Sequence, residues 1–239
     1  MYGRKTVAVV VPAFNEERLI GRTVSELPRY VDHVFVVDDG SRDGTSAVAR
    51  AEGGERTRVI RHTRNRGVGA AIATGYRAAL AAGADIAVVV GGDAQMDPSE
   101  MDRLIEPIAA GTADYVKGNR LGHREVSQRM PRARQLANRV LTELTRVAVG
   151  QPVNDSQCGY AAISRRALER LPLERLWPRY GYPNDLLGLL AARGLRTADR
   201  PVSPIYGDEV SGINPVTIGP TLAYVLARTW IRRRLSPRV

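Results

Sequence analysis

The chain has 239 residues, and 44% of them are hydrophobic, which excludes a disordered protein and allows a sizeable folded core. Its formal net charge of +10 suggests an anionic partner, such as nucleotide phosphates, nucleic acid or an acidic membrane surface. The one cysteine, Cys158, excludes an internal disulfide, and we expect its side chain to be buried. The sequence has neither a signal pattern nor a run of about 18 apolar residues, so we expect a cytoplasmic protein without a membrane-spanning helix.

The first half of the chain alternates short apolar runs with helical patterns. Strands are predicted at residues 6–11, 33–37, 58–61, 85–90 and 114–117. Helices are predicted between them, at residues 16–27, 43–51, 68–82 and 98–109. This alternation is typical of a parallel sheet built from right-handed βαβ units. We therefore predict an α/β protein whose mostly parallel sheet is flanked by helices.

The second half of the chain is less regular. Helices are predicted at residues 133–149, from 165 onward, at 184–192 and at 216–234, and strands at residues 159–163 and 196–202. Since no linker divides the chain, we expect one domain with two lobes. Much of the positive charge gathers in the middle of the chain and in the segment after Glu209, which contains no acidic residue.

Polar side chains follow three of the predicted strands at the point where each strand ends. They belong to the segments PAFNEE (12–17), DDGSRDGT (38–45) and GGDAQMD (91–97). Because the carboxyl ends of parallel strands meet at one edge of a sheet, these segments can converge on one ligand. Asn15 and Asp43 are also suited to cap the following helices. Capping does not explain the adjacent Asp38 and Asp39, whose charges repel unless hydrogen-bond donors or a cation face them.

The third of these segments offers oxygen ligands for a metal. Asp93 and Gln95 are two residues apart, and a carboxylate and an amide can together bind a hard divalent cation. An ordinary turn after the strand is the alternative interpretation, because Asp, Gly and Pro all favour turns.

Several other motifs fail on their spacing. Residues 39–44 resemble the start of a calcium-binding loop, but Arg50 stands where a bidentate Glu is required. The glycines at the start of residues 67–72 resemble a dinucleotide-binding fingerprint, but Ile72 occupies the place of its third glycine. The histidines lack metal-ligand spacing, and we expect them at the surface or in turns: His33, His62 and His123.

Three motifs, in order, resemble those of the inverting family 2 glycosyltransferases. They are VVPAFNEE (10–17), VVDDGSRDGT (36–45) and NRGVGAAI (65–72). Within that family the chain is most similar to the dolichyl- and polyprenyl-phosphate sugar synthases, from about Val7 to Gly212. The resemblance implies a GT-A fold for residues 1–212, with a nucleotide-binding lobe (1–118) and an acceptor lobe (119–212). A basic C-terminal helix and tail would follow at residues 213–239.

The resemblance implies roles for residues of the first two motifs. Pro12, Phe14 and Glu16 match the strand end that holds the nucleoside. Asp38 and Asp39 match the acids that bind the base and the ribose.

The resemblance also implies a metal site and a further nucleotide-binding residue. The third motif adds Arg66 to the residues that bind the nucleotide. The family's Asp-x-Asp-x-Gln metal motif falls on residues 91–95, so Asp93, as a catalytic residue, and Gln95 are expected to bind Mg²⁺ or Mn²⁺. Gly91 replaces the first acid, which weakens the binding of the metal or shifts it toward diphosphate oxygens and water.

An acceptor site is implied in the second half of the chain. Arg120 matches an arginine that meets phosphate, and Arg132 and Arg134 match basic residues near the acceptor phosphate. If the acceptor is a hydroxyl group, a carboxylate must take its proton, and Asp185 or Asp155 is the candidate base. If the acceptor is a lipid phosphate, which is already anionic, no strong base is required.

We therefore expect transfer of a hexose, with inversion, from a UDP- or GDP-linked sugar to polyprenyl phosphate. The alternatives are a soluble or polysaccharide hydroxyl acceptor, and a nucleotide-sugar-binding module without catalysis, which Gly91 suggests. We expect no nucleic-acid partner, because the chain lacks a recognition module. The apolar residues 216–231, which include Tyr224 and Trp230, are expected either to lie peripherally at the inner face of a membrane or to pack on the domain.

Overall fold

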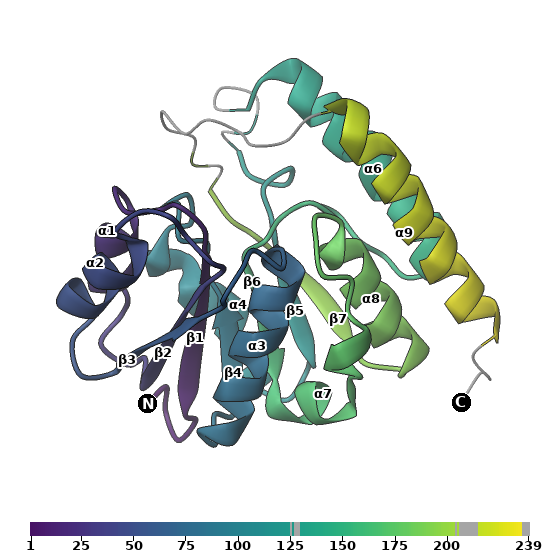
Figure 1. Cartoon of the computed structure of the whole chain (residues 1–239). Helices are drawn as coiled ribbons and strands as arrows, with labels where there is room; N and C mark the ends of the chain where they lie inside the picture. The colour runs from purple at the N-terminus through teal and green to yellow at the C-terminus, as the bar shows by residue number, and fades with distance from the viewer. Residues whose placement is uncertain (125, 127–129, 204, 206–214, 236–239) are drawn as a thin grey trace.

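The computed structural model describes residues 1–124, 126, 130–203, 205 and 215–235. Within these residues, seven strands form one sheet in the order β3-β2-β1-β4-β6-β5-β7 (Figure 1). The strands are β1 (Val7–Ala13), β2 (His33–Asp38), β3 (Thr57–Arg61), β4 (Ile86–Val89), β5 (Tyr115–Asn119), β6 (Ala161–Ser164) and β7 (Thr197–Pro201). β6 runs antiparallel to β4 and β5, and the other neighbours run parallel. The predicted α/β class with a mostly parallel sheet is therefore confirmed.

Helices cover both faces of the sheet. One face carries α1 (Ile20–Ser25), α2 (Thr45–Glu52) and α4 (Met101–Ala109), which follows the short 3-10 turn η1 (Pro98–Glu100). The other face carries α3 (Val68–Ala81), α7 (Arg165–Arg170) and α8 (Tyr182–Ala192), with the 3-10 turn η2 (Leu173–Arg175) between α7 and α8. Figure 1 shows the sheet between these two sets of helices.

The central strand β1 shows why the sheet needs a continuous apolar run. Ala8 and Val10 pack into the core on the α3 and α8 side. Val7, Val9 and Val11 pack into the core on the α1 and α4 side. Successive side chains of a strand point to opposite faces, so a strand covered on both faces must be apolar at every position.

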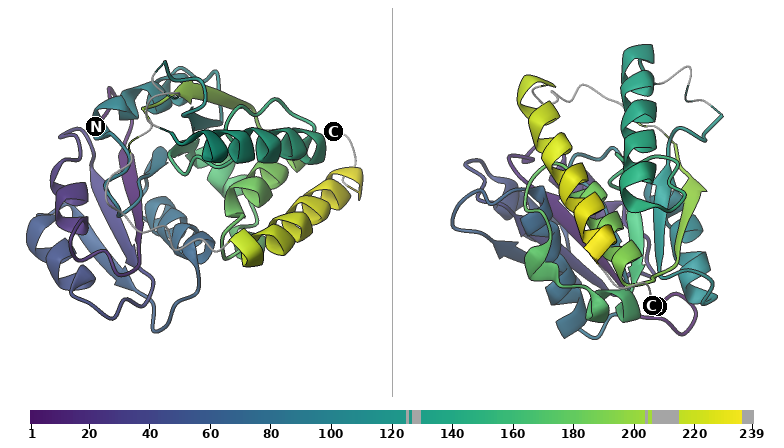
Figure 2. Two further views of the ribbon diagram at one scale, coloured as in Figure 1. Left: turned by 90° about the horizontal axis from the view of Figure 1, so that it is seen from above. Right: turned by 90° about the vertical axis from the view of Figure 1, so that its right-hand side faces the viewer.

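The last two long helices pack against each other at one side of the molecule (Figures 1 and 2). They are α6 (Arg132–Val149) and α9 (Pro215–Leu235), and α9 also contacts α8. On α9, Leu222, Val225 and Thr229 are buried, whereas Tyr224 and Trp230 are exposed. None of the described helices is both long and apolar enough to cross a lipid bilayer. The expected boundary at residue 212 lies outside the described part of the chain. Two arginines of the basic middle and C-terminal segments, Arg129 and Arg238, also lie outside it.

The predicted elements closely match the observed ones except at the first helix. A helix is predicted at residues 16–27, but α1 occupies only Ile20–Ser25. The prediction that Asn15 caps this helix is wrong, because the N-cap residue is Leu19 and Asn15 has a positive φ of 58°. The chain between β1 and α1 instead forms part of the cavity described below.

A close contact between α3 and β1 generates a stability prediction. A Cβ atom built on Gly75 would lie 2.1 Å from Cγ1 of the buried Val10, so α3 would have to move away from the sheet. We expect Gly75→Ala to lower the free energy of unfolding by about 1–3 kcal/mol, as overpacked core variants do. Urea denaturation measures this change.

The matched control is Gly219→Ala in α9, where a Cβ atom would meet no atom within 4 Å. Alanine has the higher helix propensity, but the ring of Pro220 disfavours a helical residue with a Cβ atom before it, so this control should change stability by less than about 1 kcal/mol. Equal stability of the two variants would contradict the close packing of α3 on β1.

Candidate functional site

A cavity of about 360 Å³ lies at the carboxyl ends of β1 and β4 and includes Asp39 from the end of β2. The predicted site residues that line it are Pro12, Phe14, Glu16, Asp39, Asp93, Gln95, Arg120 and Arg134. The expected convergence of three strand ends on one space is therefore observed. Parallel strands bring this about because their carboxyl ends share one edge of the sheet.

Hydrogen bonds tie the end of β1 to the segment after β2. The backbone N–H of Asn15 donates to the Ser41 hydroxyl at 2.9 Å, and the N–H of Arg42 donates to the Asn15 side chain at 2.9 Å. The N–H of Glu16 donates to the Thr45 hydroxyl at 2.8 Å. These contacts hold Asn15 in its left-handed conformation and thereby fix the neighbouring Phe14 and Glu16 at the cavity.

Asp39 is held at the cavity wall by donors from a neighbouring turn. Its carboxylate accepts the backbone N–H groups of Arg66 at 2.9 Å and Gly67 at 2.7 Å. The Nδ1 atom of His62 lies 2.7 Å from the same carboxylate. His62 lies just after the end of β3 and is buried, so the predicted surface position is wrong for this histidine. Arg66 is not among the described residues that line the cavity. Its backbone N–H, and not its side chain, contacts Asp39.

Asp38 has a structural environment that differs from that of Asp39. Its buried carboxylate accepts hydrogen bonds from the Ser41 N–H at 2.8 Å and from the Ser46 hydroxyl. Burial alone would raise the pKa of Asp38, but these hydrogen bonds and the charge of Arg61 outweigh it and lower the pKa. The described lining of the cavity does not include Asp38, so the structure gives it no contact with the space that Asp39 faces.

Asp93 and Gln95 both line the cavity, on either side of a strained residue. Ala94 between them has a positive φ of 54°, and the only other described non-glycine residue with a positive φ is Asn15. Strained backbone of this kind persists where the surrounding structure enforces it, often at functional sites. The Gln95 N–H donates to the Asp93 carboxylate at 3.2 Å, which closes the turn.

The donor set at Asp93 and Gln95 fits a hard cation that shares its ligands with a substrate. Among the residues that the structure describes, no three His, Cys, Asp or Glu side chains gather as a metal site. Mg²⁺ is commonly bound by one or two carboxylates together with substrate phosphates and water. A Cβ atom on Gly91 would lie 2.7 Å from Oδ1 of Asp93, so the Asp93 carboxylate occupies the space that a side chain at position 91 would enter.

Arg120 is fixed at the cavity by a buried carboxylate beneath it. Its Nε and Nη2 atoms donate to the two oxygens of Asp155 at 2.8 and 3.1 Å. Burial would raise the pKa of Asp155, but the charges of Arg120 and Lys117 and the Arg120 hydrogen bonds outweigh it, and the pKa is lowered. Lys117 is itself buried and donates to the carbonyl of Cys158, which is buried as expected. This network presents the Arg120 guanidinium to the cavity in one orientation.

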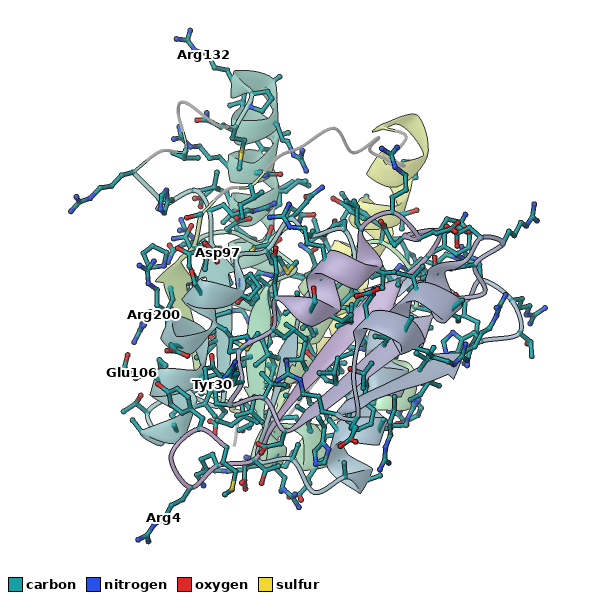
Figure 3. All side chains as sticks on the ribbon, turned by 90° about the vertical axis from the view of Figure 1, so that its left-hand side faces the viewer. Arg4, Tyr30, Asp97, Glu106, Arg132 and Arg200 are labelled. Carbon is teal, nitrogen blue, oxygen red and sulfur yellow. The ribbon has the colours of Figure 1, made fainter. Side chains whose placement is uncertain are left out.

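The structure separates the other predicted basic residues. Arg134 lines the cavity, whereas Arg132 projects away from the body of the protein at the start of α6 (Figure 3). The two candidate bases, Asp155 and Asp185, are also absent from the described lining. Asp155 is paired with Arg120, and Asp185 is paired with Arg232 of α9. The expected role of either acid as a general base thus has no support from this geometry.

An aromatic wall of the cavity was not predicted from the sequence. It comes from the segment before and at the start of α8, and consists of Tyr180 and Tyr182, with Pro183 beside them. The Tyr180 hydroxyl donates to the Gln157 side chain, which also lines the cavity, at 3.0 Å. A signal was present in the sequence, because Gly181 between two tyrosines permits the left-handed turn with φ of 97° that turns both rings to the site.

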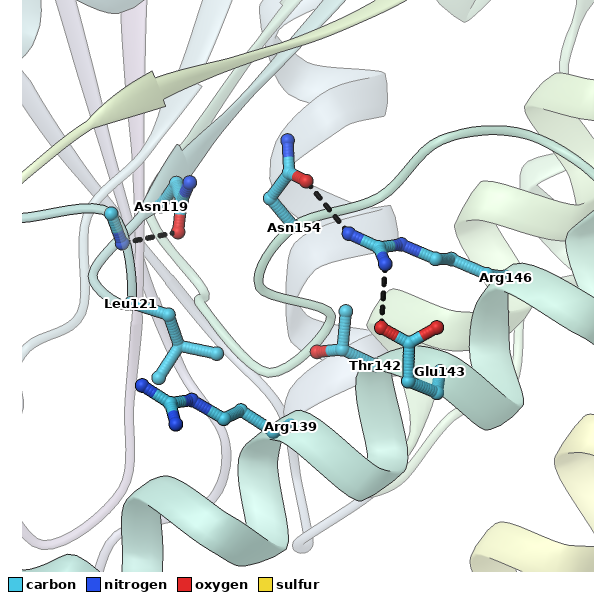
Figure 4. A pocket seen from close by; sticks show the side chains of 8 residues that line it. Asn119, Leu121, Arg139, Thr142, Glu143, Arg146 and Asn154 are labelled. Carbon is cyan, nitrogen blue, oxygen red and sulfur yellow. Dashed lines mark hydrogen bonds and ion pairs between the residues drawn. The ribbon is translucent and has the colours of Figure 1, made fainter.

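Figure 4 shows a separate cavity of about 330 Å³ between α6 and the turn after β5. Within its wall Arg146 donates to Glu143 at 2.5 Å and to Asn154 at 2.8 Å, and Asn119 accepts the Gly122 N–H at 2.9 Å. These polar groups largely satisfy one another. We therefore interpret this cavity as part of the attachment of α6 to the domain.

The pairing of Asp155 with Arg120 generates a prediction about stability and pH. Asp155→Asn should lower the free energy of unfolding by about 3–5 kcal/mol near neutral pH, because it leaves a largely buried guanidinium without its counter-charge. A lowered pKa means that the stabilisation is present above the unfolded pKa and is lost as the pH falls. The difference from the wild type should therefore shrink as the pH falls below 3.8. Urea denaturation across this pH range measures it.

The matched control is Glu143→Gln, which removes the carboxylate of an exposed ion pair with Arg146. This change should cost less than about 1 kcal/mol. A pH-independent difference for Asp155→Asn would contradict the assigned charge pairing.

Comparisons with known proteins agree with this geometry. Residues 8–172 match the family model described as "Glycosyl transferase family 2". The chain is 30% identical over 217 residues to the UDP-N-acetylglucosamine–dolichyl-phosphate N-acetylglucosaminyltransferase of Methanococcus voltae, which covers 84% of this chain and 86% of that protein. It is 29% identical over 203 residues to the polyprenol monophosphomannose synthase of Mycolicibacterium smegmatis, which covers 82% of this chain and 76% of that protein.

A solved structure extends the similarity to nearly the whole chain. The glucosyl-3-phosphoglycerate synthase of Mycobacterium tuberculosis, in complex with Mn²⁺, uridine diphosphate and glucosyl-3-phosphoglycerate, aligns with a TM-score of 0.68 and 25% identity. The alignment covers 98% of this chain and 82% of that one. With the family model matching most of the chain and its motifs converging on one cavity, the chain belongs to glycosyltransferase family 2 and is a glycosyltransferase with a GT-A fold.

Proposed function

We propose that this enzyme transfers a hexose from a UDP- or GDP-linked sugar to polyprenyl phosphate, with inversion and with Mg²⁺ or Mn²⁺ bound at Asp93 and Gln95. The observation that carries the proposal is the convergence of Arg120, Arg134 and the Asp93 turn on one cavity that also contains Asp39. Guanidinium groups suit phosphate because their planar fork binds two oxygens at once. The names of the relatives from Methanococcus voltae and Mycolicibacterium smegmatis support a lipid-phosphate acceptor.

Different residues of the cavity would bind different parts of the donor. Pro12, Phe14, Glu16 and Asp39 lie at the end nearest β1 and β2, where the nucleoside would bind. Arg120 would neutralise the charge that develops on the departing diphosphate, and Arg134, which the resemblance places near the acceptor phosphate, would add positive charge beside it. A divalent cation held by Asp93 and Gln95 would supply additional neutralisation of the diphosphate when bound.

The roles of the acidic residues in the cavity favour an acceptor that is already anionic and needs no general base. Among the described lining residues, the acids are Glu16, Asp39 and Asp93. Asp39 is occupied by donors from the turn at His62 to Gly67, Asp93 is assigned to the metal, and Glu16 is assigned to the end that binds the nucleoside. A hydroxyl acceptor must lose its proton to a base, whereas a phosphate oxygen can attack without one. This argument supports polyprenyl phosphate over a hydroxyl acceptor.

The second candidate function is transfer to a small soluble acceptor. It is favoured by the structural similarity to glucosyl-3-phosphoglycerate synthase, one structure of which holds phosphoglyceric acid. The third, a nucleotide-sugar-binding module without catalysis, is suggested by Gly91.

The polarity of α6 favours the lipid acceptor over a soluble one. Leu136, Val140, Leu144 and Val147 recur along one side of this helix, and their exposed fractions are 66%, 52%, 50% and 68%. The face that packs on the domain is mainly polar: it buries Gln135, Asn138, Thr142 and Thr145, and at the C-terminal end of the helix also Ala148 and Val149. A contiguous exposed apolar stripe is typical of a surface that meets a partner or a membrane.

Positive charge accompanies this apolar stripe. Arg132 and Arg139 are exposed on α6, and Arg234 lies above the exposed Trp230 ring of the adjacent α9 at 4.8 Å. Arginines beside apolar and aromatic side chains are suited to the interface of an acidic bilayer. We therefore propose that the enzyme contacts the membrane peripherally through α6 and the exposed side of α9.

The proposed reaction is tested with the purified protein, a panel of UDP- and GDP-linked sugars, Mg²⁺ or Mn²⁺ and a short polyprenyl phosphate. We expect one donor to yield glycosylated polyprenyl phosphate, detected by mass spectrometry, with inverted anomeric configuration by NMR. Asp93→Ala should lower turnover at saturating metal by at least about 100-fold, because it removes the charged ligand of the proposed cation.

Three outcomes would contradict parts of this proposal. Near-normal turnover of Asp93→Ala would overturn the metal assignment. Transfer to phosphoglyceric acid but not to polyprenyl phosphate would favour the second candidate. Binding of nucleotide sugars without transfer or hydrolysis would favour the non-catalytic module.

Membrane contact generates a separate prediction. A variant with Ser at positions 136, 140, 144 and 147 should lose co-sedimentation with vesicles of phosphatidylglycerol and phosphatidylcholine. Its stability should change little, because these side chains are exposed. Arg132→Gln should weaken vesicle binding about fivefold, as expected for one cation near an acidic surface.

The matched control is Arg4→Gln, because Arg4 lies at the opposite end of the molecule from Arg132 (Figure 3). It should leave vesicle binding unchanged. Retained binding by the serine variant, or a dimer that dissociates when the serines are introduced, would overturn the assignment of this face to a membrane.

A further inference from the structure

Asp185 lies at the centre of a buried contact between α8 and the C-terminal helix α9. Its carboxylate is 0% exposed and accepts hydrogen bonds from the Trp177 N–H at 2.8 Å and from Nη1 of Arg232 at 2.7 Å. Arg228, one turn earlier on α9, brings its Nε within 3.9 Å of the same carboxylate. A buried carboxylate requires such partners, because its desolvation is otherwise costly.

The same two arginines also hold the chain just before α8. Arg228 and Arg232 donate to the carbonyl oxygen of Arg175 at 2.9 and 3.4 Å. The Arg228 guanidinium lies 5.8 Å from the centre of the Trp177 ring, and the Tyr224 ring packs on Trp177 at 5.5 Å. The α9 helix therefore holds residues 175–177 in place by hydrogen bonds, a cation–π contact and a contact between aromatic rings.

Residues 175–182, which we name the bridging segment, connect this contact with α9 to one wall of the cavity. The carbonyl oxygen of Pro178 accepts the N–H of Ala70 at 3.0 Å. A Cβ atom on Gly69 would lie 2.1 Å from the Trp177 oxygen, and one on Gly67 would lie 2.5 Å from the Pro178 oxygen. The two backbones thus touch without room for a side chain, and Gly67 is one of the donors to Asp39.

The bridging segment reaches the opposite wall as well. The indole N–H of Trp177 donates to the carbonyl oxygen of Tyr180 at 2.9 Å. Tyr180 donates to Gln157, and Tyr180 and Tyr182 both line the cavity. One short segment therefore supports Asp39 on one side and the aromatic wall on the other.

We propose that α9 is a positioning element for the donor cavity, and that Asp185 with Arg228 and Arg232 forms a clamp that holds the bridging segment in its binding conformation. Asp185 is then a positioning residue, not the proton acceptor that its sequence position suggests. The clamp lies beyond the region matched by the family model, which ends at residue 172. The inference rests on the proposed function only in taking the 360 Å³ cavity as the nucleotide site.

The clamp acts at the donor site without touching the residues proposed to meet the diphosphate. None of its three side chains is among the described residues that line the cavity. Loss of the clamp should therefore weaken donor binding through a loosened wall, while Arg120, Arg134 and Asp93 remain in place. A rise in the donor KM that exceeds the fall in kcat is the expected kinetic signature.

The test measures binding of UDP and GDP by titration calorimetry, below the unfolding temperature of every variant. Arg232→Ala should weaken the affinity for the bound nucleotide about tenfold, comparable to the loss when a residue that orients a metal ligand is removed from a metal site. Arg232→Lys, which retains the charge, should recover most of that loss. Asp185→Asn should show the same direction of change, because its amide cannot balance two guanidinium groups.

The matched control is Arg233→Ala, in the same last turn of α9, whose guanidinium donates to the carbonyl oxygen of Val147 in α6 instead of to the bridging segment. It should bind nucleotide as the wild type does. A lowered Tm with unchanged nucleotide affinity in Arg232→Ala would overturn the clamp and leave the proposed function standing. Failure of the wild type to bind either nucleotide would overturn the proposed function, and the clamp proposal with it.

Discussion

The buried carboxylate of Asp39 joins the segments that meet at the cavity. It accepts the N–H groups of Arg66 and Gly67, and its Oδ1 atom lies 2.7 Å from the ring of His62. Such a carboxylate is stable in this position only because these donors replace the water it has lost. The turn that supplies them leads directly into α3, so the direction of that helix and the depth of the cavity depend on the same charge. The bridging segment packs on this turn, which extends the dependence to the far end of the chain.

The sequence predicted which segments come together at the cavity. It was less informative about which side chains of those segments point into the cavity. Buried apolar runs that end in polar residues predicted the strands and their shared edge. Asp38 and Asp39 are neighbours in sequence, yet only Asp39 lines the cavity, because the chain turns away from the strand between them and each carboxylate finds its own donors. Arg132 and Arg134 differ for a similar reason, since residues two apart on a helix point in very different directions. A sequence motif can therefore identify the segment that reaches the cavity without identifying which of its side chains lines the cavity.

The orientation of α6 shows a different limit of sequence patterns. Its alternation of apolar and polar residues predicts a helix, but the usual rule would bury Leu136 and Val140 and expose the polar face. The domain reverses this because it offers hydrogen-bond partners to the polar face. Gln135 donates to the carbonyl oxygens of Val126 and Met130, and Asn184 of α8 donates to the Thr145 hydroxyl. The partners of Gln135 lie in the segment just before α6, but Asn184 is 39 residues from Thr145, so no local pattern could have identified that contact.

One physical cause explains why few of the predicted acidic residues face the cavity. A cavity that receives a nucleoside diphosphate and an anionic acceptor gains several negative charges, and each additional carboxylate raises the electrostatic cost of binding them. Gly91 stands where the resemblance to the family's metal motif implies an acid, and Asp155 and Asp185 are buried against arginines instead of facing the cavity. Asp155 thereby orients a guanidinium toward the cavity, and Asp185 secures the bridging segment. The two carboxylates contribute to the site by holding other groups, which is consistent with a reaction that needs positive charge more than it needs a base.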